Sequence, residues 1–185
     1  VYITPATLDS SRIPVEPELV IPFQSGETVQ IGDLHITAFP KVHDACDPHS
    51  FMVRDQLVKV GIFTDLGVCC DQLKKYFRVC HAAFLESNYC TDMLEKGNYP
   101  FHLKKRISGG KGHLSNKQAL DLFVQYRGKH MSHLILSHLS KNNNHPDLVA
   151  GLFNAVRKQT HITVASRYHE MPLLTISPTA QLALF

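Results

Sequence analysis

The stretch that decides the fold runs Leu57-Val58-Lys59-Val60-Gly61-Ile62-Phe63-Thr64-Asp65-Leu66-Gly67. Its apolar, β-branched first part predicts a strand from residue 57 to residue 64, and Asp65 follows directly at the end of that strand. Upstream, Ser50–Arg54 predicts an antiparallel partner, joined through a turn at Asp55-Gln56. Downstream, the pattern changes to helices that alternate with strands.

The N-terminal part of the chain predicts extended structure. Residues 28–31 and 34–39 alternate apolar and polar side chains around Gly32-Asp33, which predicts a hairpin. Residues 8–26 are rich in Pro, Ser and Glu and predict a loop with short extended pieces. Val1–Pro5 predicts a strand that is in progress at the first residue. Because the chain does not begin with Met, we expect the natural protein to start earlier.

The C-terminal part predicts alternating elements. We expect helices at residues 70–78, 101–107, 116–127 and from Pro146 to about Lys158, and strands at 81–85, 133–136, 162–164 and 173–176. Ser115 and Gln118 have the spacing of a capping box at the start of the third helix. Hairpins followed by alternating helices and strands predict a single α/β (α+β) domain over residues 1–185, built on a sheet covered by helices.

Composition excludes several classes of protein. Hydrophobic residues make up 44% of the 185 residues and charged residues 19%, which indicates a folded domain and not a disordered chain. The net charge of +3 gives no global argument for nucleic-acid binding. No apolar run reaches the roughly 18 residues of a membrane span. The five Cys residues include no C-x-x-C pair, which favours a reducing cytoplasm over a disulfide framework or a cysteine-based zinc site.

Polar side chains follow the ends of several predicted strands. Asp65, Glu86 and His138 each come directly after an apolar strand, and His43 follows the strand at 34–39. Carboxyl ends of strands are where ligands and chemistry collect in sheets of this kind. The twelve His residues supply imidazoles close to carboxylates, which is the composition of a metal site.

Five motifs in order carry a family resemblance. They are Thr64-Asp65-Leu66-Gly67, Leu85-Glu86-Ser87-Asn88, Gly112-His113-Leu114-Ser115-Asn116, His138-Leu139-Ser140 and Val164-Ala165-Ser166-Arg167. Together they resemble the metallo-β-lactamase-fold hydrolases, above all the bacterial YycJ (WalJ) branch, with ribonuclease Z and the phosphonate-pathway phosphodiesterases as more distant relatives. The resemblance covers roughly residues 1–176. It implies the four-layer α-β-β-α sandwich of that family, incomplete at the N-terminus.

The resemblance also implies roles for individual residues. His43 matches a ligand of a first metal ion, Asp65 a catalytic carboxylate that bridges both ions, and His138 a ligand of the second. Two divalent ions, zinc or manganese, suit these donors, and one carboxylate can bridge ions about 3.5–4 Å apart. His113 matches the histidine that protonates the leaving oxygen, and Glu86 matches the carboxylate that orients it. Attack by a metal-bound hydroxide on a phosphodiester is the implied reaction.

One signature of the family is absent from this sequence. The pattern His-x-His-x-Asp-His does not occur in it. In the family it lies shortly before a segment like Val1–Leu8, so we expect it to precede residue 1. We then expect residues 1–185 alone to bind metal weakly, to be inactive, and to expose a sheet edge or face.

Substrate contacts are predicted at two places. Lys104 and Lys105, next to Arg106, form a basic cluster before His113 that either binds phosphates or is a solvated helix face. Asn142 belongs to an Asn-rich loop after His138 that could contact substrate.

The predicted function is hydrolysis of phosphodiester bonds in nucleic acid by a DNA exonuclease of the YycJ kind. A ribonuclease or small phosphodiesterase of the same fold is the first alternative. A non-catalytic binding or regulatory module is the second. The expected partner is nucleic acid, DNA before RNA, with no membrane association, and the oligomeric state is left open.

Overall fold

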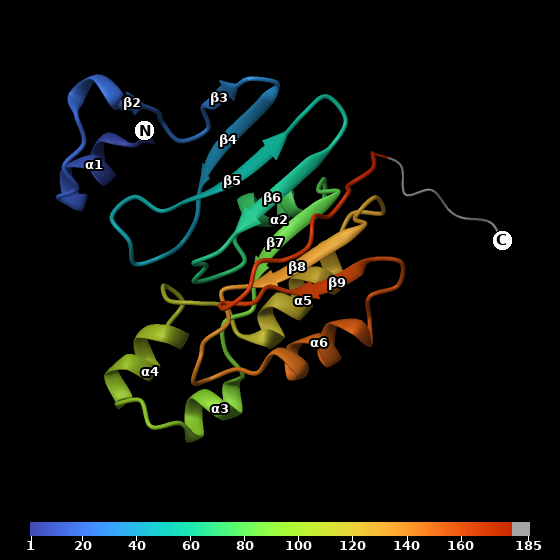
Figure 1. Cartoon of the computed structure of the whole chain (residues 1–185). Helices are drawn as coiled ribbons and strands as arrows, with labels where there is room; N and C mark the ends of the chain where they lie inside the picture. The colour runs from blue at the N-terminus through green and yellow to red at the C-terminus, as the bar shows by residue number, and fades with distance from the viewer. Residues whose placement is uncertain (179–185) are drawn as a thin grey trace.

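The computed structural model describes residues 1–178 of the chain, and a seven-stranded sheet dominates it (Figure 1). The strand order is the order of the chain, β3-β4-β5-β6-β7-β8-β9. Strands β3 to β6 pair antiparallel, and β6 to β9 pair parallel. The strands are β3 (Thr28–Ile31), β4 (Leu34–Pro40), β5 (His49–Arg54), β6 (Lys59–Phe63), β7 (Ala82–Glu86), β8 (His133–Ser137) and β9 (His161–Val164).

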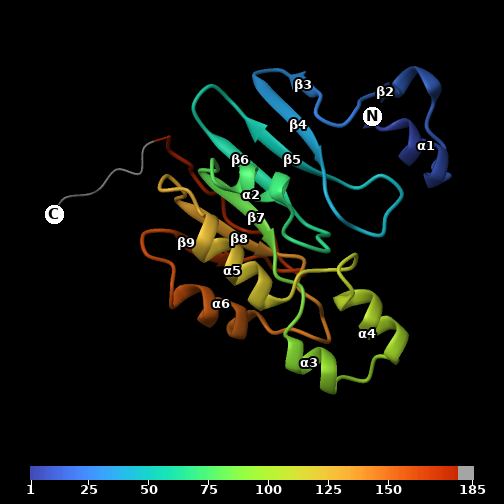
Figure 2. The same ribbon diagram turned by 180° about the vertical axis from the view of Figure 1, so that it is seen from behind.

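Three helices cover one face of this sheet, as Figures 1 and 2 show from opposite sides. They are α2 (Asp71–Phe77), α5 (Asn116–Tyr126) and α6 (Pro146–Asn154). Their apolar sides pack on Phe63, Leu85 and Leu136, which are fully buried side chains of β6, β7 and β8. Two further helices, α3 (Thr91–Lys96) and α4 (Phe101–Ser108), lie beyond one end of the sheet (Figure 1).

The opposite face of the sheet is apolar as well. Ala38, Phe51, Ile62, Phe84 and Ile135 are paired in register from β4 to β8, so they form one row across five strands. Because side chains alternate along a strand, this row points away from the three helices. It is covered unevenly, since Ile135 is 2% exposed and Ile62 is 36% exposed. An apolar character on both faces is typical of a sheet that lies between two layers.

The α/β class predicted from the sequence is confirmed. Of the four layers that the resemblance implies, the described residues contain one large sheet and its helical layer. The predicted capping box is present at α5, where Ser115 and Gln118 bond reciprocally. The helix after Pro146 ends at Asn154, earlier than predicted, because Val156 bonds back to Phe153 in a turn and Lys158 has a φ of 51°.

Several predictions at the two ends were wrong. The first strand is only β1 (Tyr2–Ile3), and helix α1 (Pro5–Ser11) occupies the start of the predicted loop, before the short helix η1 (Pro17–Leu19). Strand β2 (Ile21–Pro22) pairs with β1 in a separate small sheet. Residues 173–176 are not a strand, because they have no strand partner and Leu173 is fully exposed. Within residues 1–178, every helix is too short or too polar to cross a bilayer.

Candidate metal centre

The candidate centre lies at the carboxyl ends of the parallel strands. Asp65 follows β6, Glu86 is the last residue of β7, and His138 follows β8. Asp65 and His138 have left-handed backbones, with φ of 53° and 57°. Such a conformation costs a non-glycine residue about 1–3 kcal/mol, and it is concentrated at functional sites. The backbone therefore turns sharply at both strand ends and presents the two side chains to one another.

Glu86 is the buried anchor of the centre. Its Oε1 accepts hydrogen bonds from His113 Nδ1 at 2.7 Å and from His138 Nδ1 at 2.9 Å. Its Oε2 accepts the backbone N–H of Leu66 at 2.6 Å. Burial alone opposes ionisation, but these hydrogen bonds outweigh it and hold the pKa of Glu86 below its usual value. The same carboxylate raises the pKa of His138.

His43 is brought to the centre by a separate loop. The loop after β4 is tied to the loop after β6, where Gly67 N–H bonds to the Val42 carbonyl at 2.7 Å. His43 Nδ1 donates to the Gly112 carbonyl at 2.9 Å, and its Nε2 lies 3.9 Å from Asp65 Oδ1. His43 and Asp65 belong to different loops of the chain, and the structure places them side by side.

Three imidazoles and one carboxylate converge here. The His113 ring lies 5.3 Å from the His43 ring and 5.0 Å from the His138 ring, measured between centroids. Asp65 Oδ1 lies 3.6 Å from His138 Nδ1. Asp65, His113 and His138 each offer one donor atom, and these atoms lie within 4.8 Å of one another. The sequence predicted His43, Asp65 and His138 as ligands, so the structure adds His113 to the donors within reach.

The donor set fits a divalent metal ion. Each of the three imidazoles is hydrogen bonded through Nδ1 to a carbonyl or carboxylate oxygen, which fixes its proton there. The Nε2 atoms then carry free lone pairs. Metal-ligating histidines characteristically donate their other ring N–H to such an oxygen. Residues that would hold the ion or ions are His43, Asp65 and His138, with His113 close by.

Two further charged residues lie at the centre; Lys41 was not predicted, and Arg106 was named only as part of the basic cluster before His113. Lys41 is largely buried; its Nζ donates to the Thr64 carbonyl at 2.8 Å and lies 4.0 Å from Asp65 Oδ2. Burial lowers the pKa of Lys41, and the charge of Asp65 partly opposes that shift. Arg106 Nε donates to Asp44 Oδ2 at 2.6 Å, beside His43. In the sequence, Lys41 is marked by its place at the end of a predicted strand, and Arg106 by the basic cluster before His113.

A buried polar network supports the loops behind the centre. The side-chain amides of Asn116 and Asn144 bond to each other at 2.8 and 2.9 Å. Asn144 Nδ2 also donates to the carbonyls of Ser87 and Asn88. Asn88 Nδ2 donates to the His138 carbonyl at 2.7 Å. The three loops that follow β7, precede α5 and follow β8 are thus held together next to His138.

Within residues 1–178, no hydrogen bond or ion pair joins Lys104, Lys105 or Asn142 to the side chains of the centre. Lys104 Nζ donates to the Glu95 carbonyl at 2.7 Å and so joins α4 to α3. Lys105 is exposed on α4. Asn142 Nδ2 donates to the Tyr99 hydroxyl at 3.1 Å, on the rim of a cavity of about 430 Å³. Substrate contact by these three residues stays a prediction.

Fold and site together define an α/β protein with a candidate metal centre at the carboxyl ends of its parallel strands. A family model described as a beta-lactamase superfamily domain matches residues 4–139, and the chain belongs to that superfamily. The matched range includes every predicted site residue from His43 to His138, and Asn142 lies beyond it.

Curated relatives are 30% identical to this chain over the aligned residues. An exodeoxyribonuclease YycJ from Bacillus anthracis is 30% identical over 137 residues, which are 74% of this chain and 51% of the relative. An exodeoxyribonuclease WalJ from Streptococcus pneumoniae is 30% identical over 126 residues, which are 68% of this chain and 47% of the relative. The chain therefore spans about half the length of the curated relatives it matches.

Solved structures agree on the fold. The metallo-beta-lactamase fold protein YhfI from Bacillus subtilis superposes with a TM-score of 0.68 at 16% identity, over 89% of this chain and 61% of that one. Zinc-bound PqqB from Methylobacterium extorquens gives a TM-score of 0.65 at 15% identity, with the same two shares. At such identities the likeness establishes the metallo-β-lactamase fold alone.

Proposed function

We propose that the protein containing residues 1–185 is a metal-dependent hydrolase of phosphodiester bonds in nucleic acid, acting as a DNA exonuclease. The observation that carries this proposal is the convergence of His43, Asp65, His113 and His138 around buried Glu86. The similarity to relatives named exodeoxyribonucleases supports DNA as the substrate.

The residues of the centre have separate roles. His43, Asp65 and His138 would hold two divalent ions, zinc or manganese. Such ions would supply Lewis-acid polarisation of a phosphoryl oxygen and lower the pKa of a water. Glu86 keeps the rings of His113 and His138 in one orientation through Nδ1, so that both Nε2 atoms remain free.

His113 transfers the proton to the leaving oxygen. Its Nδ1–H donates to the carboxylate of Glu86 at 2.7 Å, which holds the ring in one orientation. Proton donation by a positioned imidazole contributes about 10²–10⁴-fold to a rate. His113→Ala should therefore slow cleavage by that factor and leave the number of bound ions unchanged, which separates this role from metal ligation.

The test is cleavage of labelled single-stranded DNA and RNA by the full natural protein with Zn²⁺ or Mn²⁺. We expect DNA to be shortened from an end, RNA to be cleaved more slowly, and Asp65→Ala to reduce both to background. Asp33→Ala removes the same charge from an exposed turn and should cleave like wild type. Equal activity of Asp65→Ala and wild type would overturn the proposal, as would the absence of cleavage with either metal.

A cytoplasmic location is part of the proposal. It rests on the five cysteines, which are all free thiols in the structure and so suit a reducing compartment.

A further inference from the structure

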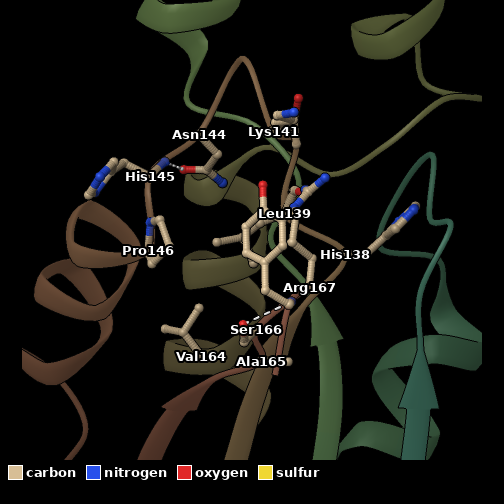
Figure 3. Close-up of a pocket in the computed structure, with 12 residues that line it drawn as sticks. His138, Leu139, Lys141, Asn144, His145, Pro146, Val164, Ala165, Ser166 and Arg167 are labelled. Carbon is tan, nitrogen blue, oxygen red and sulfur yellow. Dashed lines mark hydrogen bonds between the residues drawn. The ribbon is translucent and has the colours of Figure 1, made fainter. Parts of the chain in front are cut away.

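A second feature lies directly beside the candidate metal centre. A cavity of about 630 Å³ opens between the loop that joins β8 to α6 and the segment that follows β9 (Figure 3). Pockets for small molecules and cofactors typically have about 300–1,000 Å³, so this one has room for a nucleotide. His138 belongs to its lining.

His138 connects the cavity to the metal centre. In Figure 3 its ring points away from the other lining residues and toward the loop after β6, where Asp65 lies. Its Nδ1 lies 3.6 Å from Asp65 Oδ1. His138 therefore lies both in the lining of the cavity and beside the candidate metal centre.

The charged side chains of the lining favour an anionic ligand. Lys141 and Arg167 belong to its described lining, and that lining contains neither Asp nor Glu. Lys141 is exposed and makes no hydrogen bond or ion pair with any other residue in the range 1–178. Arg167 is held in place by one bond from Nη2 to the Leu139 carbonyl, which leaves other guanidinium N–H groups free to donate.

Two hydroxyl groups of the lining are also free to donate. Ser140 Oγ accepts from the backbone N–H of Asn143 at 3.2 Å, and Ser166 Oγ accepts from the backbone N–H of Tyr168 at 3.0 Å, drawn as a dashed line in Figure 3. Because a hydroxyl that accepts keeps its own proton available, each serine can donate to a phosphate oxygen. Serine hydroxyls are among the donors that contact phosphate oxygens in protein–DNA complexes.

The remaining lining suits a base and a sugar. The walls include the apolar side chains of Leu139, Pro146, Val164 and Ala165. Tyr168 belongs to the lining and is 70% exposed as a residue, so a face of its ring can take a stacked base. Base stacking on aromatic side chains is common to proteins that bind single strands.

We propose that this cavity binds the nucleotide next to the cleaved phosphodiester of a single DNA strand. Lys141 and Arg167 contact its phosphate, and Tyr168 stacks on its base. The inference rests on the proposed function for the identity of the substrate, and it adds the substrate-binding residues that the sequence did not indicate.

The test is binding of a short fluorescein-labelled single-stranded oligodeoxynucleotide in the presence of a chelator, measured by anisotropy at several salt concentrations. Loss of one phosphate contact to a single strand reduces the slope of log affinity against log salt by about 0.7. We expect Lys141→Ala to show this reduction. Lys129→Ala removes the same charge from an exposed position distant from the cavity and should keep the wild-type slope.

The stacking contact has its own pair of variants. Tyr168→Ala should weaken binding by roughly 5- to 100-fold, the effect of losing one stacked base, whereas Tyr168→Phe keeps the ring and should bind like wild type. Equal slopes for Lys141→Ala and Lys129→Ala, or equal affinities for Tyr168→Ala and Tyr168→Phe, would overturn the inference. So would the absence of any binding by the wild type.

Failure of this inference is distinguishable from failure of the proposed function. If Asp65→Ala abolishes metal-dependent cleavage while the Lys141 and Tyr168 variants bind and cleave like wild type, the cavity assignment fails and the hydrolase stands. If the wild type cleaves nothing but Lys141→Ala still lowers the salt slope, binding of a single DNA strand by the cavity stands and the hydrolase fails.

Discussion

Replacing Glu86 with Gln changes one oxygen of a fully buried side chain into an amino group. The carboxylate accepts from His113 at 2.7 Å, from His138 at 2.9 Å and from Leu66 N–H at 2.6 Å, using both oxygens. A Gln amide has only one acceptor, so at least one of these donors then faces another donor. A lost bond to a charged group costs roughly 1.5–3 kcal/mol, and an unsatisfied buried donor roughly 1–3 kcal/mol more. We expect the free energy of unfolding to fall by about 3–5 kcal/mol.

The assay is urea unfolding of the metal-free protein in a chelator, followed by circular dichroism. The midpoint should fall while the dependence on urea keeps its slope, because the surface exposed on unfolding is unchanged. Glu95→Gln makes the same chemical change on the exposed side of α3 and should stay within about 0.5 kcal/mol of wild type. A loss below about 1 kcal/mol for Glu86→Gln would refute the role of Glu86 as the buried anchor.

The same variant has a defined pH dependence. The pKa of Glu86 is held below 4.5, so its stabilising effect is complete above pH 4.5 and is lost as the pH falls through the lower folded-state pKa. The pKa of His138 is raised above 6.5, so its contribution is complete below pH 6.5 and is lost as the pH rises through the folded-state pKa. The difference in stability between wild type and Glu86→Gln should therefore be largest between pH 4.5 and 6.5. A difference that does not vary with pH would contradict this.

Other predictions concern packing and thiol chemistry. Gly61→Ala should reduce the free energy of unfolding by about 1–3 kcal/mol, because the added Cβ would lie 2.1 Å from the Phe63 ring. Gly151→Ala is its control in urea unfolding, since a Cβ there meets nothing within 4 Å. Burial raises the pKa of Cys80 to about 12, so mass spectrometry after alkylation at pH 8 should find Cys80 modified only on unfolding. The exposed Cys46 should react in the native protein, and equal labelling of both thiols would contradict the burial.

Local signals in the sequence predicted most of the regular elements. The hairpin around Gly32-Asp33, the strands β6, β7 and β8, and the capping box at Ser115 depend on residues close together in the chain. The start of α1 had such a signal as well, because Thr4 caps it and Pro5 is its first residue, but the apolar residues before it favoured a strand. Helix α3 had none, since Cys90 at its N-cap makes no side-chain bond.

The sequence predicted most of the residues of the site, but not all of the contacts among them. Asp65, Glu86 and His138 are marked by their places at strand ends, and the parallel register of β6, β7 and β8 then brings them together. The approach of Lys41 to Asp65 depends on a loop conformation that no short-range pattern specifies. The cavity that includes Arg167 depends on how the segment after β9 folds back toward His138, which is a long-range contact.

Calorimetric titration of Zn²⁺ or Mn²⁺ into the full natural protein tests the candidate metal centre most directly. If His43, Asp65 and His138 share the bound ions, then Asp65→Ala should lower the affinity at both sites, and His43→Ala and His138→Ala should each weaken one. His102→Ala, which removes an exposed imidazole from α4, should titrate like wild type. Wild-type affinity and stoichiometry in Asp65→Ala would contradict the claim that these side chains form a metal centre.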